Sequence, residues 1–93
     1  MKREDVVKTL IVILKEIQNE VSDEVEEIVV STCPVGGMSH FDSLMGVVAT
    51  ARCFEKFELK DEKTVSLFES KKHGEPLTVG DVADRIITLK SKE

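Results

Sequence analysis

The amino-acid sequence predicts a single all-α domain over residues 1–93. Apolar residues recur every three or four positions in three stretches, which is the spacing of one face of an α-helix. Only one short run of β-branched residues stands outside these stretches, and a lone strand leaves its backbone N–H and C=O groups unpaired. With 93 residues, of which 41% are hydrophobic, the chain has enough apolar side chains for one modest core and is too short for two domains.

The first helix is predicted from about Glu4 to Val21. Acidic residues in its first turn suit the positive end of the helix dipole. Its apolar residues share one face, which predicts a helix packed on the core. Ile11 and Ile13 widen this face, as expected for a helix that is covered on more than one side. The main stripe comprises Val7, Leu10, Leu14, Ile17 and Val21.

A long irregular connection is predicted from Ser22 to about His40. Pro34, Gly36 and Gly37 lie within it, and both residue types interrupt regular structure. The β-branched run at 28–30 is expected to be loop that is pinned onto the core, because no second run of this kind exists to pair with it.

The second helix is predicted from about Ser43 to Phe57. Met45, Ala49 and Cys53 add to the stripe of apolar residues that is expected to face the core, so that much of the circumference of the helix is apolar. Such an extent is unusual for a helix with one side in water. The stripe expected to face the core comprises Leu44, Val47, Val48, Ala51 and Phe54.

A short third helix or turn is predicted near Lys63 to Phe68, followed by an exposed loop at 71–74. The last helix then begins near Thr78, which is spaced so that it and Asp81 can each cap the backbone of the other. Its expected apolar face comprises Val79, Val82, Ala83, Ile86, Ile87 and Leu89.

The net charge of −5 arises entirely in the first part of the chain. Residues 1–42 contain nine acids and four bases, whereas residues 43–93 contain nine of each. Nucleic-acid binding requires a clustered basic surface, so no nucleic-acid partner is expected. The acidic run from Asp23 to Glu27 either favours basic protein partners or only keeps a loop solvated.

The two cysteines, Cys33 and Cys53, lack the spacing of a metal-binding pair, and no metal site is expected. The sequence is compatible with a disulfide between them. The simpler interpretation is that both cysteines are reduced, as in the cytosol, and act as small apolar side chains. Glu4, Asp5 and Lys15 interrupt the basic and apolar parts of any signal peptide, and no stretch is long enough to span a bilayer. We therefore expect a cytoplasmic monomer with no membrane insertion.

The tetrapeptide Phe41-Asp42-Ser43-Leu44 stands where the connection gives way to the second helix. Serine and aspartate are common N-cap residues, and capping alone accounts for the tetrapeptide taken in isolation. Its surroundings add a second interpretation. Together with the helical spacing that follows it, the chain length and the segment 76–84, the motif resembles the acyl carrier protein family over most of the chain.

In that family the serine of an Asp-Ser-Leu motif carries a covalent 4′-phosphopantetheine arm, which a phosphopantetheinyl transferase moves from coenzyme A. The resemblance implies a four-helix acyl-carrier-like bundle with a long first loop and a short third helix. It also implies that Ser43 is the attachment site, with Asp42 beside it and Leu44 docked next to the arm.

The resemblance further implies a non-catalytic carrier, itself a substrate of acyl-transferring or acyl-activating enzymes. Acyl groups would travel as thioesters on the arm, a flexible tether that raises their effective concentration at successive active sites. An aliphatic interior around Val47, Ala51 and Ile86 would shield a chain. Fatty-acid, polyketide and amino-acyl carriers are equally compatible with the sequence.

Carriers of this family usually present acids along the second helix to basic patches on partner enzymes. Here Met45, Val48 and Phe54 stand at positions that are commonly acidic. We therefore expect partner binding through these three apolar residues, with less dependence on charge. The alternative is a carrier-fold interaction module without phosphopantetheine, in which the apolar helix binds a partner and Ser43 is only a cap.

Ser43 is not expected to be an enzyme nucleophile. A catalytic serine needs a base within hydrogen-bonding distance and a third group that orients that base. His40 lies three residues before Ser43, and His73 lies in a predicted loop without an evident partner. Asp42 is not needed as a base, because a modifying enzyme can activate the hydroxyl itself.

Overall fold

The computed structural model describes residues 2–21, 27–38, 41–60, 66–70 and 74–91. The helices are α1 (Arg3–Val21), α2 (Pro34–Gly37), α3 (Ser43–Phe57) and α4 (Val79–Ser91). Within the described residues the only β-type pairing is one antiparallel bridge between Glu69 and Pro76. The predicted all-α class is therefore confirmed for this part of the chain.

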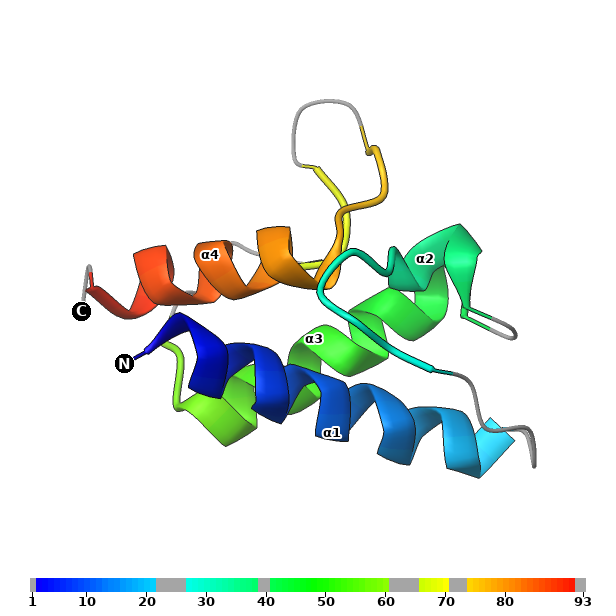
Figure 1. Ribbon diagram of the computed structural model, residues 1–93, viewed down its shortest axis with the longest axis horizontal. Helices are drawn as coiled ribbons and strands as arrows, with labels where there is room; N and C mark the ends of the chain where they lie inside the picture. The colour runs from blue at the N-terminus through cyan, green and yellow to red at the C-terminus, as the bar shows by residue number, and fades with distance from the viewer. Residues whose placement is uncertain (1, 22–26, 39–40, 61–65, 71–73, 92–93) are drawn as a thin grey trace.

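The three long helices share one core, because α1 packs against both α3 and α4 (Figure 1). α2 is a four-residue turn that packs against α3, and Val35 and Gly36 within it have non-helical backbone angles. At the surface, the Arg3 guanidinium of α1 donates to Asp84 of α4, with 2.8 Å between Nε and Oδ1. This arrangement leaves the start of α3 next to α2, away from the ends of α1 and α4 that carry the chain termini (Figure 1).

The predicted stripe of α1 is confirmed where its side chains are described. Leu10, Leu14 and Ile17 are completely buried, and Val7 is half-buried. Val6, which the predicted stripe omitted, is buried as well. The side chain of Val21 lies outside the described residues. The core is aliphatic apart from phenylalanine, in keeping with a chain that has no tryptophan or tyrosine.

The start of α4 has the reciprocal cap that the sequence predicts. The Thr78 hydroxyl accepts the Asp81 N–H at 3.1 Å, and the Asp81 carboxylate accepts the Thr78 N–H at 3.3 Å. Two further backbone N–H groups, of Val79 and Gly80, donate to carbonyl oxygens at 32 and 30 in the long connection. These bonds satisfy donors that have no partner within the helix.

The connection between α1 and α3 is pinned onto the core at Ile28, which is buried, as predicted. Val29 and Val30 are 42% and 44% exposed, so Ile28 alone of this run buries its side chain, while Val30 is held through its carbonyl oxygen, which accepts the Gly80 N–H. The described part of this connection contains no strand, but it does contain α2, a turn that the sequence analysis did not predict. Pro34 occupies the first position of α2, where its missing N–H costs nothing.

The predicted third helix near 63–68 is not present in its described part. Residues 66–68 are not helical, and residues 63–65 lie outside the described residues. Leu67 and Phe68 are both completely buried. Neighbouring residues of a helix point in different directions, whereas a non-helical segment held between two helices can bury both side chains. Among the described residues, four helices are therefore assigned only if α2 is counted in place of the predicted third helix.

Candidate functional site

Asp42 and Ser43 begin α3, and they have different roles there. Asp42 is the N-cap: its Oδ1 accepts the backbone N–H of Met45 at 3.0 Å, and its carbonyl oxygen accepts the N–H of Gly46. Ser43 is the first residue inside the helix, and its side chain is exposed. Of the two residues that the sequence offers as caps, Asp42 is therefore the cap, and the alternative in which Ser43 caps the helix is wrong.

The solvent face of α3 is apolar over its first turns. Leu44 is 70% exposed, Val47 is 38% exposed and Val48 is 39% exposed, and Ala51 is exposed too. We call these four residues the outer stripe. They follow Ser43 at helical spacing, and Glu55 is the first acid within the helix. The first turns of α3 are therefore apolar on this side and contain no acid after the Asp42 cap.

The core face of α3 consists of small residues. The predicted core stripe is wrong for the four residues of the outer stripe, because the helix is rotated so that small residues point inward. It holds for Phe54, which packs against the core, and the predicted contribution of Ala49 and Cys53 is confirmed. These buried residues are Gly46, Ala49, Thr50 and Cys53.

Close packing at Gly46 explains part of this orientation. A Cβ at Gly46 would lie 3.3 Å from a methyl group of Val35 and 3.8 Å from Cβ of Phe68. The Thr50 hydroxyl is buried at no cost in lost hydrogen bonds, since it donates to the Gly46 carbonyl at 2.7 Å and accepts the Leu67 N–H at 2.8 Å. The side of α3 that carries Gly46 and Thr50 is therefore buried because it fits closely against Val35 and Phe68 and forms hydrogen bonds there.

The three residues predicted to bind partners are not equally accessible. Val48 belongs to the outer stripe, whereas Met45 and Phe54 are half-buried and pack against the core. Their role in partner binding stays a prediction. Val48, together with Leu44, offers the more accessible apolar contact.

The predicted aliphatic interior around Val47, Ala51 and Ile86 does not form. Val47 and Ala51 lie on the outer face of α3, while Ile86 is completely buried in α4. The rotation of α3 separates these residues, because it turns the first two away from the core.

Phe41 and Phe68 support the start of α3. Phe41 is buried, and its ring meets the Phe68 ring edge-on with 5.9 Å between centroids. The Phe41 carbonyl oxygen accepts the Gly36 N–H, which ties α2 to the residue just before the Asp42 cap. The serine is thus presented on a helix end that has its own local packing.

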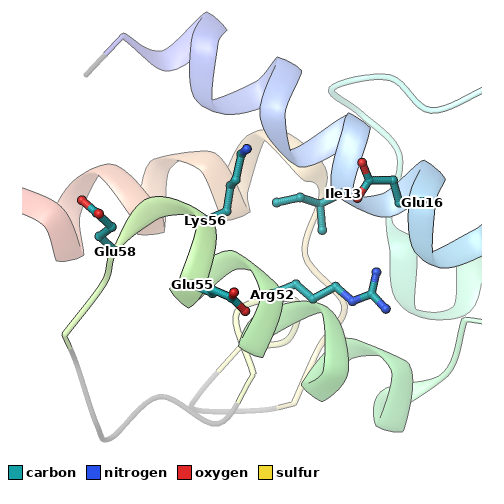
Figure 2. A pocket seen from close by; sticks show the side chains of 6 residues that line it. All are labelled: Ile13, Glu16, Arg52, Glu55, Lys56 and Glu58. Atoms are coloured by element: carbon teal, nitrogen blue, oxygen red, sulfur yellow. The ribbon is translucent and has the colours of Figure 1, made fainter.

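A hollow of about 300 Å³ lies between α1 and the C-terminal half of α3 (Figure 2). Arg52 at its edge is fixed by Glu20 of α1, whose carboxylate oxygens accept from Nη2 at 2.7 Å and 2.9 Å. Most of the lining is ionisable, so the hollow offers little of the apolar contact that an acyl chain requires. Its lining comprises Ile13, Glu16, Arg52, Glu55, Lys56 and Glu58.

The other candidate residues contribute little to this site. His40 and His73 lie outside the described residues. Cys33 is half-buried, Cys53 is buried, and both thiols are free. Burial raises the pKa of the Cys53 thiol to about 12, which keeps that thiol neutral near pH 7. In the described segments, no group of three or more histidine, cysteine, aspartate or glutamate side chains is placed to hold a metal ion.

Comparison of the chain with protein-family models, with curated proteins and with solved structures found no match. As far as the chain is described, none of its helices combines the length and the hydropathy needed to cross a membrane. The candidate site therefore rests on its own geometry: an exposed serine after an aspartate cap, followed by an exposed apolar stripe.

Proposed function

We propose that this chain is an acyl carrier protein that holds acyl groups as thioesters on a 4′-phosphopantetheine arm attached to Ser43. One observation carries the proposal: an exposed serine, flanked by Asp42 and Leu44, is the first residue of a helix that packs on the core. In this proposal the protein is a substrate of a phosphopantetheinyl transferase and of acyl-handling enzymes, and it catalyses no reaction itself.

The residues around Ser43 fit a phosphodiester-linked arm. The serine side chain is exposed, so its Oγ can enter the active site of another enzyme. Backbone N–H groups and the helix dipole at the start of α3 favour the negative charge of a phosphate. Asp42 is an adjacent acid, but its Oδ1 already accepts the Met45 N–H, and the first turn of α3 contains no acid.

The arm would supply a terminal thiol on which acyl groups form thioesters. Ser43 contributes Oγ, which would form the new bond to phosphorus as the diphosphate bond of coenzyme A breaks and adenosine 3′,5′-bisphosphate leaves. The transferase would remove the serine proton, so the chain needs no base of its own for this step. Asp42 keeps the first turn of α3 formed and so presents the serine on ordered backbone. Leu44, the most exposed large apolar residue of α3, offers a contact beside the arm.

The outer stripe is the partner-binding surface in this proposal. It begins directly after Ser43, and an enzyme that acts on the serine or the arm must approach it. Burial of aliphatic side chains is insensitive to ionic strength, whereas contacts between exposed charges weaken as salt is added. Recognition through the outer stripe therefore implies transfer rates that depend only mildly on salt.

The test is the intact mass of the protein after incubation with coenzyme A and a panel of phosphopantetheinyl transferases. We expect one phosphopantetheinyl group on the wild-type chain and none on Ser43→Ala. Ser91→Ala removes another exposed serine, at the end of α4, and should be loaded like the wild type. An arm on Ser43→Ala, or no arm on the wild type with any transferase of the panel, contradicts the proposal.

A protein-interaction module without phosphopantetheine is the second candidate, and the exposed outer stripe favours it independently of Ser43. Large aliphatic side chains on a solvent face often mark a binding surface. The two candidates separate on Ser43→Ala: a carrier loses its arm and its activity, whereas an interaction module binds its partner unchanged. Val48→Glu should impair both.

A further inference from the structure

The segment Ser66–Glu69, which we call the strap, is fixed by side chains from both α3 and α4. Arg85 of α4 donates from Nη1 to three carbonyl oxygens of the strap, at 2.9 Å, 3.0 Å and 3.2 Å. Thr50 of α3 accepts the Leu67 N–H at 2.8 Å. Bonds from a charged guanidinium are stronger than bonds between neutral groups, so Arg85 is a strong attachment of the strap to α4. The Phe68 carbonyl also accepts the Leu77 N–H, just before α4 begins.

Phe68 connects the strap to the start of α3. It is completely buried, its ring contacts the Phe41 ring, and its Cβ lies 3.8 Å from the place that a Cβ at Gly46 would take. Phe41 directly precedes the Asp42 cap, and Gly46 donates to the Asp42 carbonyl in the first hydrogen bond of α3. Phe68 therefore packs on both ends of the turn that contains Ser43.

α1 also has core contacts outside the strap. It packs directly against both α3 and α4, and its apolar face is buried from Val6 to Ile17. Native proteins open locally where few contacts hold a segment, while the better-packed helices stay closed. Loss of the strap should therefore loosen the start of α3 before it loosens α1.

We propose that the strap is a latch for the start of α3. While Arg85 holds it, Phe68 keeps Phe41 and the first turn of α3 packed; when it is released, that turn opens and Ser43 is no longer presented on ordered backbone. A partner that binds near the strap can thereby change the presentation of Ser43 without touching the serine. The latch is a property of the unmodified chain and goes beyond the proposed function.

Amide hydrogen exchange on the unmodified protein tests the latch. In Arg85→Gln, the N–H groups of Met45 and Gly46 should exchange at least about tenfold faster than in the wild type, which corresponds to about 1.4 kcal/mol. The amides of residues 10–17 in α1 should change by less than about threefold, because their exchange requires opening of the whole core.

Two variants serve as controls. Arg3→Gln removes a different arginine contact to α4, the ion pair with Asp84, and should leave exchange at Met45 and Gly46 unchanged. Arg85→Lys keeps a cationic donor at the position and should restore part of the protection. If Arg85→Gln does not fold, Arg85→Lys serves as the test variant, and it should give the same local pattern with a smaller acceleration, because one ammonium group cannot reproduce all three bonds of the guanidinium.

Two outcomes would overturn the latch. One is a uniform acceleration along α1, α3 and α4, which would mean that Arg85 contributes only to overall stability. The other is acceleration confined to 66–69, with Met45 and Gly46 unchanged. Neither outcome depends on whether Ser43 accepts an arm, so failure of the latch is distinguishable from failure of the carrier proposal.

Discussion

The two faces of α3 differ in a way that side-chain hydrophobicity alone does not explain. The buried face carries glycine, alanine, threonine and cysteine, whereas the outer stripe carries leucine, two valines and an alanine. Gly46 is buried because Val35 and Phe68 approach it closely, and Thr50 is buried because its hydroxyl has both a donor and an acceptor. Fit to neighbours therefore outweighs the transfer of larger aliphatic groups out of water.

This contrast gives α3 two separate tasks. Its small face anchors the helix to the core, and its aliphatic face remains in solvent directly after Ser43. When a partner covers aliphatic side chains that were exposed to water, the free energy falls, and binding is favoured. The comparison thus connects the packing of the helix with the proposal that its outer side is a surface for other enzymes.

The largest expected effect is the difference in the free energy of unfolding between alanine variants of two leucines, one buried and one exposed. Leu14→Ala should lower the free energy of unfolding by about 2–4 kcal/mol, because Leu14 is completely buried and its loss leaves a cavity. Leu44→Ala should change it by less than about 0.5 kcal/mol, since Leu44 is 70% exposed. Denaturant titration measures both.

Ile86→Ala should resemble Leu14→Ala, because Ile86 is also completely buried. A loss below about 1 kcal/mol at both Leu14 and Ile86 would contradict the assignment of the core. An equal loss at Leu14 and Leu44 would contradict the orientation of α3.

The buried face also predicts a pH dependence through Cys53. Its pKa is raised from 9.0 to about 12 by burial, so the folded state holds the proton more tightly than the unfolded state. Stability is therefore complete below about pH 9 and falls as the pH rises toward 12, with a slope approaching about 1.4 kcal/mol per pH unit. Cys53→Ala should lack this loss, while Cys33→Ala should retain it.

Unfolding titrations at several pH values between 7 and 11 measure this effect as the difference between wild type and Cys53→Ala. Other groups that titrate in this range are present in both proteins and cancel in the comparison. If the wild type and Cys53→Ala lose stability in parallel, the thiol is not buried as described.

A smaller effect distinguishes the two residues at the start of α3. Asp42→Ala should cost about 1 kcal/mol of stability, because it removes the side-chain acceptor of the Met45 N–H. Ser43→Ala should cost less than about 0.5 kcal/mol, since Ser43 is exposed and does not cap the helix. Thermal or chemical unfolding that ranks the two variants in the opposite order would contradict the cap assignment.

The periodicity of the sequence was sufficient for α1 and α4 because large apolar residues there occupy one face and charged residues the others. It also predicted the bounds of α3, but not its rotation, since apolar residues occur all around that helix. The deciding contacts come from Val35 and Phe68, which belong to a short turn and a non-helical strap. Long-range packing of this kind is not encoded in the periodicity of large apolar residues.

The candidate site was predictable in part. The motif at 42–44 indicates a helix start, and the structure assigns the cap to Asp42 and the exposed first position to Ser43. The outer stripe was missed, although Gly46, Thr50 and Cys53 recur at helical spacing and could have indicated a small buried face. The strap was not predictable, because it depends on Arg85 binding three backbone carbonyls from another segment.

The smallest effect on stability is expected on the outer stripe. Val48→Glu should change the free energy of unfolding by less than about 0.5 kcal/mol but should lower the rate of phosphopantetheine transfer or acyl transfer. Met45→Glu should impair transfer as well, but it should also destabilise the fold, because Met45 is half-buried against the core. Raising the ionic strength should reduce the wild-type rate only mildly.

The competing possibility is that the acidic run from Asp23 to Glu27 is the docking surface; residues 23–26 lie outside the described residues. Charge reversal in that run provides the control. If it lowers the transfer rate more than Val48→Glu does, and if the wild-type rate collapses on adding salt, the outer stripe is not the surface that partners recognise.

The most direct test of the carrier assignment is to locate the arm by fragment mass spectrometry on the protein loaded from coenzyme A. We expect one phosphopantetheinyl group, on Ser43, and unmodified serine at every other position of the chain. Attachment to any other serine, or a chain that stays unmodified with every transferase tested, would contradict the claim that the start of α3 presents Ser43 as a carrier site.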